Sequence, residues 1–392
     1  MTNCLAATVF CAGVFPFANT SIKNMLDSTN FTESTTYFNT QVSPTSSLSP
    51  SASPTVTPST FPSPQPTTPP PNPPTQLNPV SIEMNKLNAA VGHRFADEVM
   101  IFVGIGTTDT ENNTLADYVS GRISQITSAG YKPLVVVEPS NSTGLISFNE
   151  LAAGAYDIRF KYFMNVLKSK GITNESIGSW VLLPEPNVPS WNKTNFDNKD
   201  FGLIFNRLSK IVKMQFPRAK TTVLFDAKSY ESNDTDWANG KKVSFAPYLT
   251  KVNTRLLDSI GLQAFPWYSP NGVDKLTDPK DFMPTNLITE ASQLTGVKNI
   301  WINTGIVHQY KSSSGAIVTV PFAERIVTMN TLQGILGALP RNNMKVSVNL
   351  FMEEKLSNEG RNFQFQTPEE QKKLSSFVYG LERRGLSFSV KY

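Results

Sequence analysis

Apolar runs alternate with amphipathic stretches from about residue 83 to the end of the chain. The run 99–105 is apolar throughout, which is typical of a parallel strand buried on both faces. The apolar residues that follow it recur at helical spacing, so the pattern predicts a strand and then a helix. The same alternation predicts further strands over 133–137, 180–183, 222–225, 260–265, 299–302 and 345–351.

Repeated strand–helix units indicate a parallel sheet with right-handed crossovers. Seven such strands, with an eighth in the weaker segment 80–84, favour a closed (β/α)8 TIM barrel over an open sheet. A Rossmann-type fold is the second interpretation. Gly104 and Gly106 follow the first clear strand, but the third glycine of the dinucleotide-binding fingerprint is missing.

The amino-terminal part of the chain differs in character from the predicted barrel. Residues 1–20 resemble a signal peptide, because the apolar stretch 5–17 is too short to span a bilayer and small residues lie near Ala18. No Lys or Arg precedes Lys23, which departs from the usual signal-peptide pattern. We expect a secreted or cell-surface protein.

Residues 21–80 are predicted to form a disordered Ser/Thr/Pro-rich linker. The stretch 34–82 has no charged side chain, and 13 of the 28 prolines lie between residues 44 and 79. Such a segment has few apolar residues to offset the entropy of ordering, and proline keeps it extended. A spacer and a passive tail both fit this composition. Residues 81–392 then form the barrel domain.

Composition excludes several classes of partner and cofactor. The net charge is only +4, and no basic run suggests nucleic acid as a partner. Cys4 and Cys11 are the only cysteines, so neither a disulfide framework nor a cysteine-based metal site is expected. His93 and His308 are the only histidines, and neither has a second histidine at ligand spacing, so we expect no metal and no cofactor. His308 follows a predicted strand end, where a loop residue and a substrate contact are both open interpretations.

Candidate chemistry gathers where the predicted strands end, because active sites of (β/α)8 barrels lie at the carboxyl ends of the strands. Carboxylates that can protonate a leaving oxygen and aromatic rings that can stack on sugars suggest glycoside chemistry. The candidates at these ends are Glu138, Glu185, Asp226, Phe265, Trp267, Tyr268, Asn303 and Glu353.

Glu185 has the most specific surroundings of these residues. It follows an apolar strand, lies between Pro184 and Pro186, and is followed by Asn187 and Trp191. Two flanking prolines restrict the backbone and so fix the direction of a side chain. We therefore expect Glu185 to act in a site, with Asn187 and Trp191 as binding residues.

Several short segments together resemble glycoside hydrolase family 26, the endo-β-mannanase-like barrels of a clan of retaining glycosidases. The similarity extends over roughly residues 85–355. In this resemblance, residues 99–104 correspond to the second barrel strand. Residues 184–191 correspond to the acid/base segment, and residues 302–305 to the end of the strand that carries the nucleophile. Further matching segments are 133–139, 154–157 and 258–262. The resemblance implies a β-linked polysaccharide such as mannan or glucan as substrate, with Glu185 as the acid/base.

The sequence departs from this family at the positions of the catalytic residues and their neighbours. The nucleophile position is Asn303, and an amide cannot act as that nucleophile. The supporting tyrosine is replaced by Phe265, the histidine before the acid/base by Pro184, and the aspartate of the sixth strand by Gln263.

Three functions fit these observations. The first is a hydrolase with a rearranged site, in which Glu138, Asp226 or Glu353 activates water at the separation of about 6.5–9.5 Å that an inverting enzyme needs. The second is a degenerate barrel that binds polysaccharide without cleaving it. The third is a structural or adhesive surface module. The identity of the glycan and the oligomeric state stay open.

Overall fold

The computed structural model describes residues 78–187, 198–226, 245–268, 275–276, 285–312, 314–339, 343–356 and 360–392. The expected signal-like segment 1–20, nearly all of the linker 21–80, and Trp191 lie outside the described residues.

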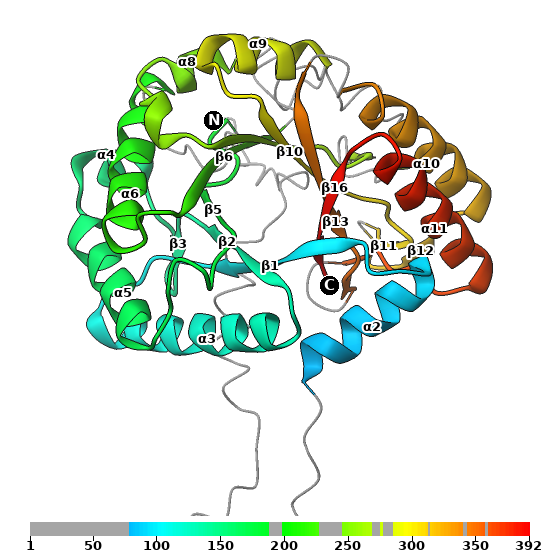
Figure 1. The fold of residues 1–392 in the computed structure, drawn as a ribbon, viewed down its shortest axis with the longest axis horizontal. Coiled ribbons are helices and arrows are strands. Elements are labelled where there is room, and N and C mark those ends of the chain that lie inside the picture. Colours follow the sequence, from blue (N-terminus) through cyan, green and yellow to red (C-terminus); the bar gives the residue numbers. More distant parts are fainter. Residues whose placement is uncertain are drawn as a thin grey trace, which may run out of the picture.

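Eight parallel strands close into a barrel, as the sequence predicts (Figure 1). Around the barrel their order is β1-β16-β13-β10-β7-β6-β5-β2, and every neighbouring pair, including the closing pair of β1 and β2, is parallel. The strands are β1 (Ala96–Val103), β2 (Lys132–Val137), β5 (Ser179–Leu182), β6 (Lys220–Asp226), β7 (Ser259–Gln263), β10 (Asn299–Gly305), β13 (Lys345–Phe351) and β16 (Ser387–Lys391).

Helices surround this barrel and cover the outer faces of its strands (Figure 1). The α-helices are α2 (Pro79–Val91), α3 (Asp109–Ser128), α4 (Phe148–Ala153), α5 (Asp157–Ser169), α6 (Phe201–Gln215), α8 (Ala246–Leu249), α9 (Thr285–Thr295), α10 (Phe322–Leu336) and α11 (Pro368–Glu382). Two short 3₁₀ helices are η2 (Asn198–Asp200) and η4 (Thr254–Leu256). Helices α4 and α5 separate at Gly154, where φ is 80°.

The eighth strand is not the segment 80–84, and that prediction was wrong. These residues lie in α2, whose first turn is set by the side chain of Asn78, which accepts from the Val80 N–H, and by Pro79 at the helix start. The eighth strand is β16, close to the end of the chain. It lies between β13 and β1, so 99–104 belongs to the first strand in chain order rather than the second (Figure 1).

Additional short strands follow several barrel strands and so lie at the carboxyl end of the barrel. The loops after β10 and β13 together form one antiparallel sheet in the order β12-β11-β15-β14. Its strands are β11 (Gln309–Lys311), β12 (Ile317–Thr319), β14 (Glu354–Lys355) and β15 (Arg361–Asn362). The loop after β2 forms β3 (Ser140–Asn141) and β4 (Gly144–Leu145), and the loop after β7 forms β8 (Trp267–Tyr268) and β9 (Lys275–Leu276).

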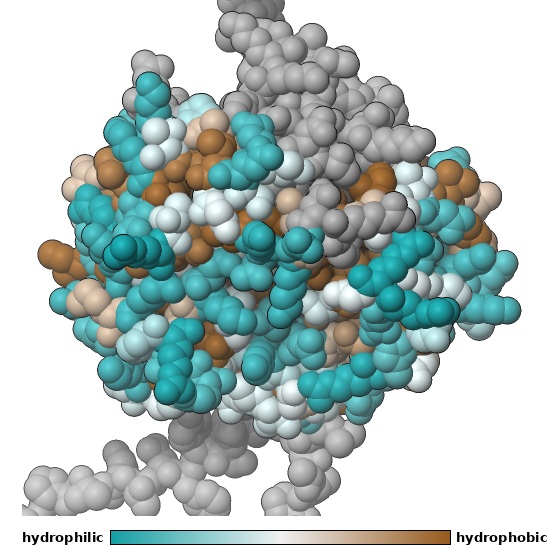
Figure 2. Space-filling view, turned by 45° about the horizontal axis from the view of Figure 1, so that its top comes forward, coloured by the Kyte–Doolittle hydropathy of each residue, from teal (hydrophilic) through white to brown (hydrophobic). Residues whose placement is uncertain are grey.

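The surface of the described residues is mainly hydrophilic in the view of Figure 2, with hydrophobic residues in small separate groups. Within the described part of the chain, no helix combines the length and the apolar character needed to cross a membrane.

Candidate functional site

Three neighbouring strands each place a carboxylate at the carboxyl end of the barrel. Glu138 directly follows β2, Glu185 follows β5 after a short turn, and Asp226 is the last residue of β6. Their exposed fractions are only 1%, 2% and 5%. Because β5 pairs with both β2 and β6, Glu185 is flanked by the strand ends that carry the other two acids.

The backbone around Glu185 is held in an unusual conformation. Leu183 and Glu185 have φ of 55° and 58°, and each precedes a proline. Positive φ is uncommon for residues other than glycine, and residues before proline favour extended backbone, so both residues are strained. The Glu185 N–H donates to the Leu224 carbonyl at 2.6 Å, and the Leu183 N–H donates to the Val137 carbonyl at 2.9 Å. These bonds tie the turn to both neighbouring strands, and strain of this kind is typical of functional sites.

Asn187 links this turn to the end of β6. Its Nδ2 donates to the Asp226 carbonyl at 2.8 Å, and its Oδ1 accepts from the Asp226 N–H at 2.9 Å. The predicted binding residue therefore has both ends of its amide group bound to backbone. Its described role is to hold Asp226 and the Glu185 turn in a fixed relation.

Asn303 belongs to a chain of hydrogen-bonded side chains inside the barrel. Its Nδ2 donates to Gln263 Oε1 at 2.8 Å, and its Oδ1 accepts from Asn349 Nδ2 at 2.7 Å. Ser389 Oγ donates to Asn349 Oδ1 at 3.0 Å, and Trp301 Nε1 donates to Ser389 Oγ at 3.4 Å. Gln263, Asn303, Asn349 and Ser389 occupy paired positions on β7, β10, β13 and β16.

This register explains why sequence reasoning missed Asn349 and Ser389. Each is a polar residue among apolar neighbours on its strand, which was the available signal, but their connection to Asn303 appears only when the strands pair. Both are almost fully buried. The side-chain amide of Asn303 therefore has a hydrogen-bond partner for both its N–H donor and its oxygen acceptor, and these bonds stabilise an amide at this buried position.

Phe265 packs within an aromatic cluster at the end of the barrel interior. Its ring centroid lies 5.0 Å from that of Phe351 and 5.6 Å from that of Phe363, and Phe265 is 1% exposed. Phe351 also contacts Phe102 edge-on. Gly305 makes room for the cluster, because a Cβ atom there would lie 2.9 Å from both Phe351 and Phe363. In the described contacts, Phe265 is a packing residue rather than an open stacking surface.

Glu353 forms an ion pair with Lys391. The Lys391 Nζ lies 2.6 Å from Glu353 Oε2, and both side chains are largely buried. The Glu353 carbonyl also accepts from the Phe363 N–H at 3.0 Å. This ion pair connects the loop after β13 to the last residue of β16.

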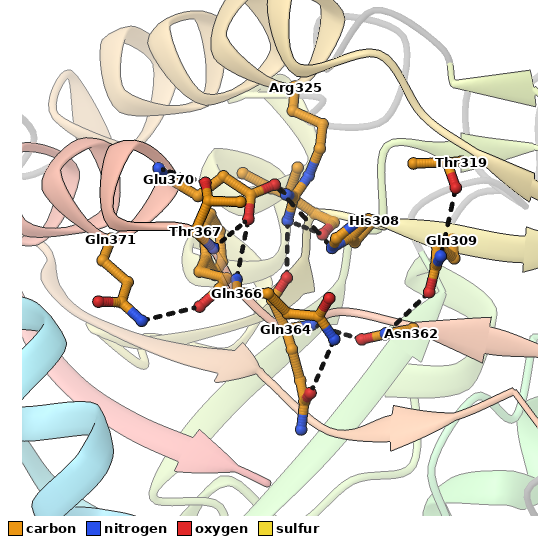
Figure 3. Close-up of polar contacts among 12 residues, drawn as sticks. His308, Gln309, Thr319, Arg325, Asn362, Gln364, Gln366, Thr367, Glu370 and Gln371 are labelled. Atoms are coloured by element: carbon orange, nitrogen blue, oxygen red, sulfur yellow. Dashed lines mark hydrogen bonds and ion pairs between the residues drawn. The ribbon is translucent and has the colours of Figure 1, made fainter.

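His308 lies at the start of the small sheet, beside a polar cluster between α10 and α11 (Figure 3). Its Nδ1 is 3.9 Å from Glu370 Oε1, and Glu370 forms a buried ion pair with Arg325. Burial alone would raise the pKa of Glu370. The backbone N–H groups of Thr367 and Gln366, together with Arg325, hold that pKa below its ordinary value. The contacts of His308 are therefore with a cluster that joins two helices to the small sheet.

Two further aromatic candidates are described only in part. Trp267 and Tyr268 form β8, which pairs with Lys275 and Leu276 of β9, and their side chains lie outside the described residues. Among the described residues, no group of three or more His, Cys, Asp or Glu side chains could hold a metal ion.

Comparison with known proteins supports the fold class. No protein-family model matches the sequence, and no curated protein matches it. Among solved structures, the chain is similar to fungal β-1,4-galactanases, with 14% identity and a TM-score of 0.50 over 77% of this chain and 91% of that chain. A family 1 β-glucosidase from Thermotoga maritima matches with 10% identity and a TM-score of 0.49, over 79% of this chain and 87% of that chain. The protein is thus a (β/α)8 barrel whose similar solved structures include glycosidases.

Proposed function

We propose that this protein is an extracellular inverting glycoside hydrolase that acts on O-glycosyl bonds of a β-linked polysaccharide such as mannan or glucan. The observation that carries the proposal is the group of buried carboxylates Glu138, Glu185 and Asp226 on three neighbouring strand ends. Glycoside hydrolysis generally needs two carboxyl groups on opposite sides of the scissile bond.

Glu185 acts as the general acid in this proposal. Its protonated carboxyl group gives a proton to the glycosidic oxygen, and the bond between that oxygen and the anomeric carbon breaks, with the electron pair passing to the leaving oxygen. The strained turn and its two backbone hydrogen bonds keep the carboxyl group in one place relative to the neighbouring strands. The side chain of Glu185 is almost fully buried at the carboxyl end of the barrel.

Asp226 acts as the general base. It takes a proton from a water molecule as the water oxygen bonds to the anomeric carbon from the opposite face, so the configuration inverts. Asn187 bonds to both backbone groups of Asp226 and lies two residues after Glu185, which keeps the two acids at a constant spacing. Neighbouring strands lie about 4.8 Å apart, and side chains that diverge from adjacent strand ends can reach the roughly 6.5–9.5 Å of inverting enzymes.

A retaining mechanism at the family 26 positions does not fit this site. Asn303 stands at the position that the family resemblance assigns to the nucleophile, and its amide is bound on both sides by Gln263 and Asn349. Glu353 is paired with Lys391. We place the second acid on β6 or β2, because the ends of these strands flank the end of β5 that carries Glu185.

Carbohydrate binding without cleavage is the second candidate function. The amide network around Asn303 favours it, because that network stabilises a side chain that cannot form a glycosyl ester. In this alternative, Glu185 and Asp226 accept hydrogen bonds from sugar hydroxyl groups. The structural or adhesive module of the sequence analysis would bind no β-glycan at this end of the barrel.

The test uses soluble mannan, β-glucan and β-1,4-galactan with the intact protein and with Glu185→Gln and Asp226→Asn. The hydrolase proposal expects reducing-sugar release that falls at least about 100-fold in both variants, since general acid–base catalysis contributes that much or more. Binding without release by any form supports the second candidate. If Glu138→Gln abolishes release and Asp226→Asn does not, the assignment of the base is wrong.

A further inference from the structure

A cavity of about 520 Å³ lies at the end of the barrel opposite the carboxylates described above. Its lining comes from the first residues of the barrel strands, including Lys132 of β2, Lys220 of β6 and Lys345 of β13. Small-molecule sites typically occupy about 300–1,000 Å³. The cavity is thus large enough for a ligand, and it is separate from the proposed catalytic site.

The lining of this cavity is rich in hydroxyl groups that pair across neighbouring strands. Thr222 and Ser259 lie 2.5 Å apart on β6 and β7, and Ser347 and Ser387 lie 2.8 Å apart on β13 and β16. Each pair uses one hydroxyl proton for the bond between its members. One donor and several acceptor lone pairs per hydroxyl pair are left for a ligand.

One side of the cavity has the chemistry of an oxyanion site. Lys345 and Ser347 are two residues apart on β13, so they point to the same face of the strand, and Ser387 pairs with Ser347 in register. An ammonium group next to two hydroxyl groups can bind the oxygens of a phosphate group by charge and by hydrogen bonds.

The lining on β1, the strand that pairs with β16, has the chemistry of a hydroxyl-binding site. Glu98 of β1 accepts a hydrogen bond from Ser179 Oγ at 3.3 Å and is attracted by Lys220 and Lys132. Burial raises the pKa of Glu98, against the effect of Lys220. A carboxylate with remaining acceptor positions in a partly enclosed cavity is well suited to bind ligand hydroxyl groups.

We propose that this cavity at the amino-terminal end of the barrel binds a small phosphate ester that carries hydroxyl groups, such as a sugar phosphate. Lys345, Ser347 and Ser387 bind its phosphate group, and Glu98 and Ser179 bind its hydroxyl groups. Trp301 and Phe388 contribute the apolar part of the lining. The proposal does not depend on glycosidase activity at the opposite end.

Isothermal titration of the full-length protein at constant ionic strength tests this site, with glucose 6-phosphate, inorganic phosphate and glucose as probes. Glucose 6-phosphate is expected to bind saturably and more tightly than either of the other probes. Lys345→Met is expected to weaken binding of both phosphate-containing probes about fivefold, the effect of about 1 kcal/mol for one partly exposed charge. Lys372→Met removes an exposed lysine that does not line the cavity and is expected to leave binding unchanged.

Glu98→Gln separates the two halves of the site. It is expected to weaken glucose 6-phosphate relative to inorganic phosphate, because only the sugar ligand loses its carboxylate acceptor. Ser387→Ala serves as a second test of the phosphate side if Lys345→Met does not fold. The proposal is overturned if glucose 6-phosphate does not bind, if it binds no better than phosphate, or if Lys345→Met and Lys372→Met behave alike. Glu185→Gln should bind the probes as the unmodified protein does, so failure of the proposed hydrolase function would not affect this result.

Discussion

Asn349 Nδ2 donates a hydrogen bond of 2.7 Å to Asn303 Oδ1, and this bond joins two buried amides at paired positions on adjacent strands of the barrel. Asn303 Nδ2 in turn donates to Gln263 Oε1, so the series of hydrogen bonds continues to β7. The end of β10 is therefore built around an amide, so the proposed hydrolase mechanism needs carboxylates from other strand ends.

Substitution of Asn303 should show how strongly the barrel depends on this amide chain. Asn303→Leu removes the partner of Gln263 Oε1 and leaves Asn349 Nδ2 with only the Met100 sulfur at 3.8 Å. Each unsatisfied buried group costs about 1–3 kcal/mol. We expect a loss of about 2–4 kcal/mol in the free energy of unfolding, measured by chemical denaturation. Asn303→Asp is the matched control. A carboxylate can accept from Asn349 and, after rotation of the Gln263 amide, from Gln263 as well, so its loss should be clearly smaller. Equal losses in both variants would contradict the account of the network.

Asn187 should control the geometry of the two proposed catalytic acids. Asn187→Ala removes two hydrogen bonds to the backbone of Asp226, so we expect a loss of about 1–3 kcal/mol in stability. We also expect a lower kcat on a cleaved glycan, because Glu185 and Asp226 are then no longer held at a fixed distance from each other. Asn187→Asp keeps the acceptor for the Asp226 N–H and should retain more activity than Asn187→Ala. A change in KM alone would instead indicate that Asn187 contacts substrate.

Gly305 should be intolerant of even one added methyl group. A Cβ atom there would lie 2.9 Å from Phe351 and 3.0 Å from Phe265, and overpacking of this kind costs about 1–3 kcal/mol. Gly334→Ala is the control, because Gly334 lies within α10 with no atom near the added Cβ, and alanine favours helix by about 0.5–1 kcal/mol. Thermal unfolding should show a lower Tm for Gly305→Ala and a higher Tm for Gly334→Ala. An unchanged Tm for Gly305→Ala would show that the aromatic cluster is loosely packed.

The ion pair of Arg325 and Glu370 should make stability depend on pH in the acid range. The folded protein holds the pKa of Glu370 below its ordinary value, so this group stabilises the fold above the unfolded pKa of about 4.3. That contribution is lost as the pH falls through the folded pKa. Glu370→Gln should cost about 3–5 kcal/mol at pH 7, because it leaves the buried Arg325 without its charge partner.

The pH series for this pair compares three proteins by chemical denaturation. The difference between the unmodified protein and Glu370→Gln should be constant near neutral pH and should shrink below about pH 4. Glu369→Gln changes the exposed neighbour of Glu370 and should cost less than about 1 kcal/mol. A difference that does not change with pH would show that the carboxylate of Glu370 is not the stabilising group.

The barrel could largely be predicted from the sequence, because seven of its strands are apolar runs. Such a run can be recognised without knowing which strands lie beside it. The eighth strand was missed for a physical reason. Residues 387–391 include two serines that face a polar cavity, so the segment is less apolar than the other strands. Apolar and polar residues alternate over 80–84 as in a strand, but this pattern is short. The helix cap at Asn78 and the proline at position 79 outweigh it and favour a helix.

The site was only partly predictable from the sequence. Glu138, Glu185 and Asp226 could be assigned to strand ends, because acids there can be recognised once the strands are known. The hydrogen bonds of Asn187 and Asn303 depend on which strands are neighbours and on their register, which no local pattern contains. The pairing of Glu353 with Lys391 likewise required the position of β16.

In the proposed mechanism, Glu185 protonates the leaving group of a β-glycan while a second acid activates water. Proton NMR of the first sugar released from mannan or β-glucan tests it most directly, because the anomeric signals identify the configuration before mutarotation. We expect the unmodified protein to release the α-anomer and Glu185→Gln to release no sugar. Release of the β-anomer, or release that persists in Glu185→Gln, would contradict it.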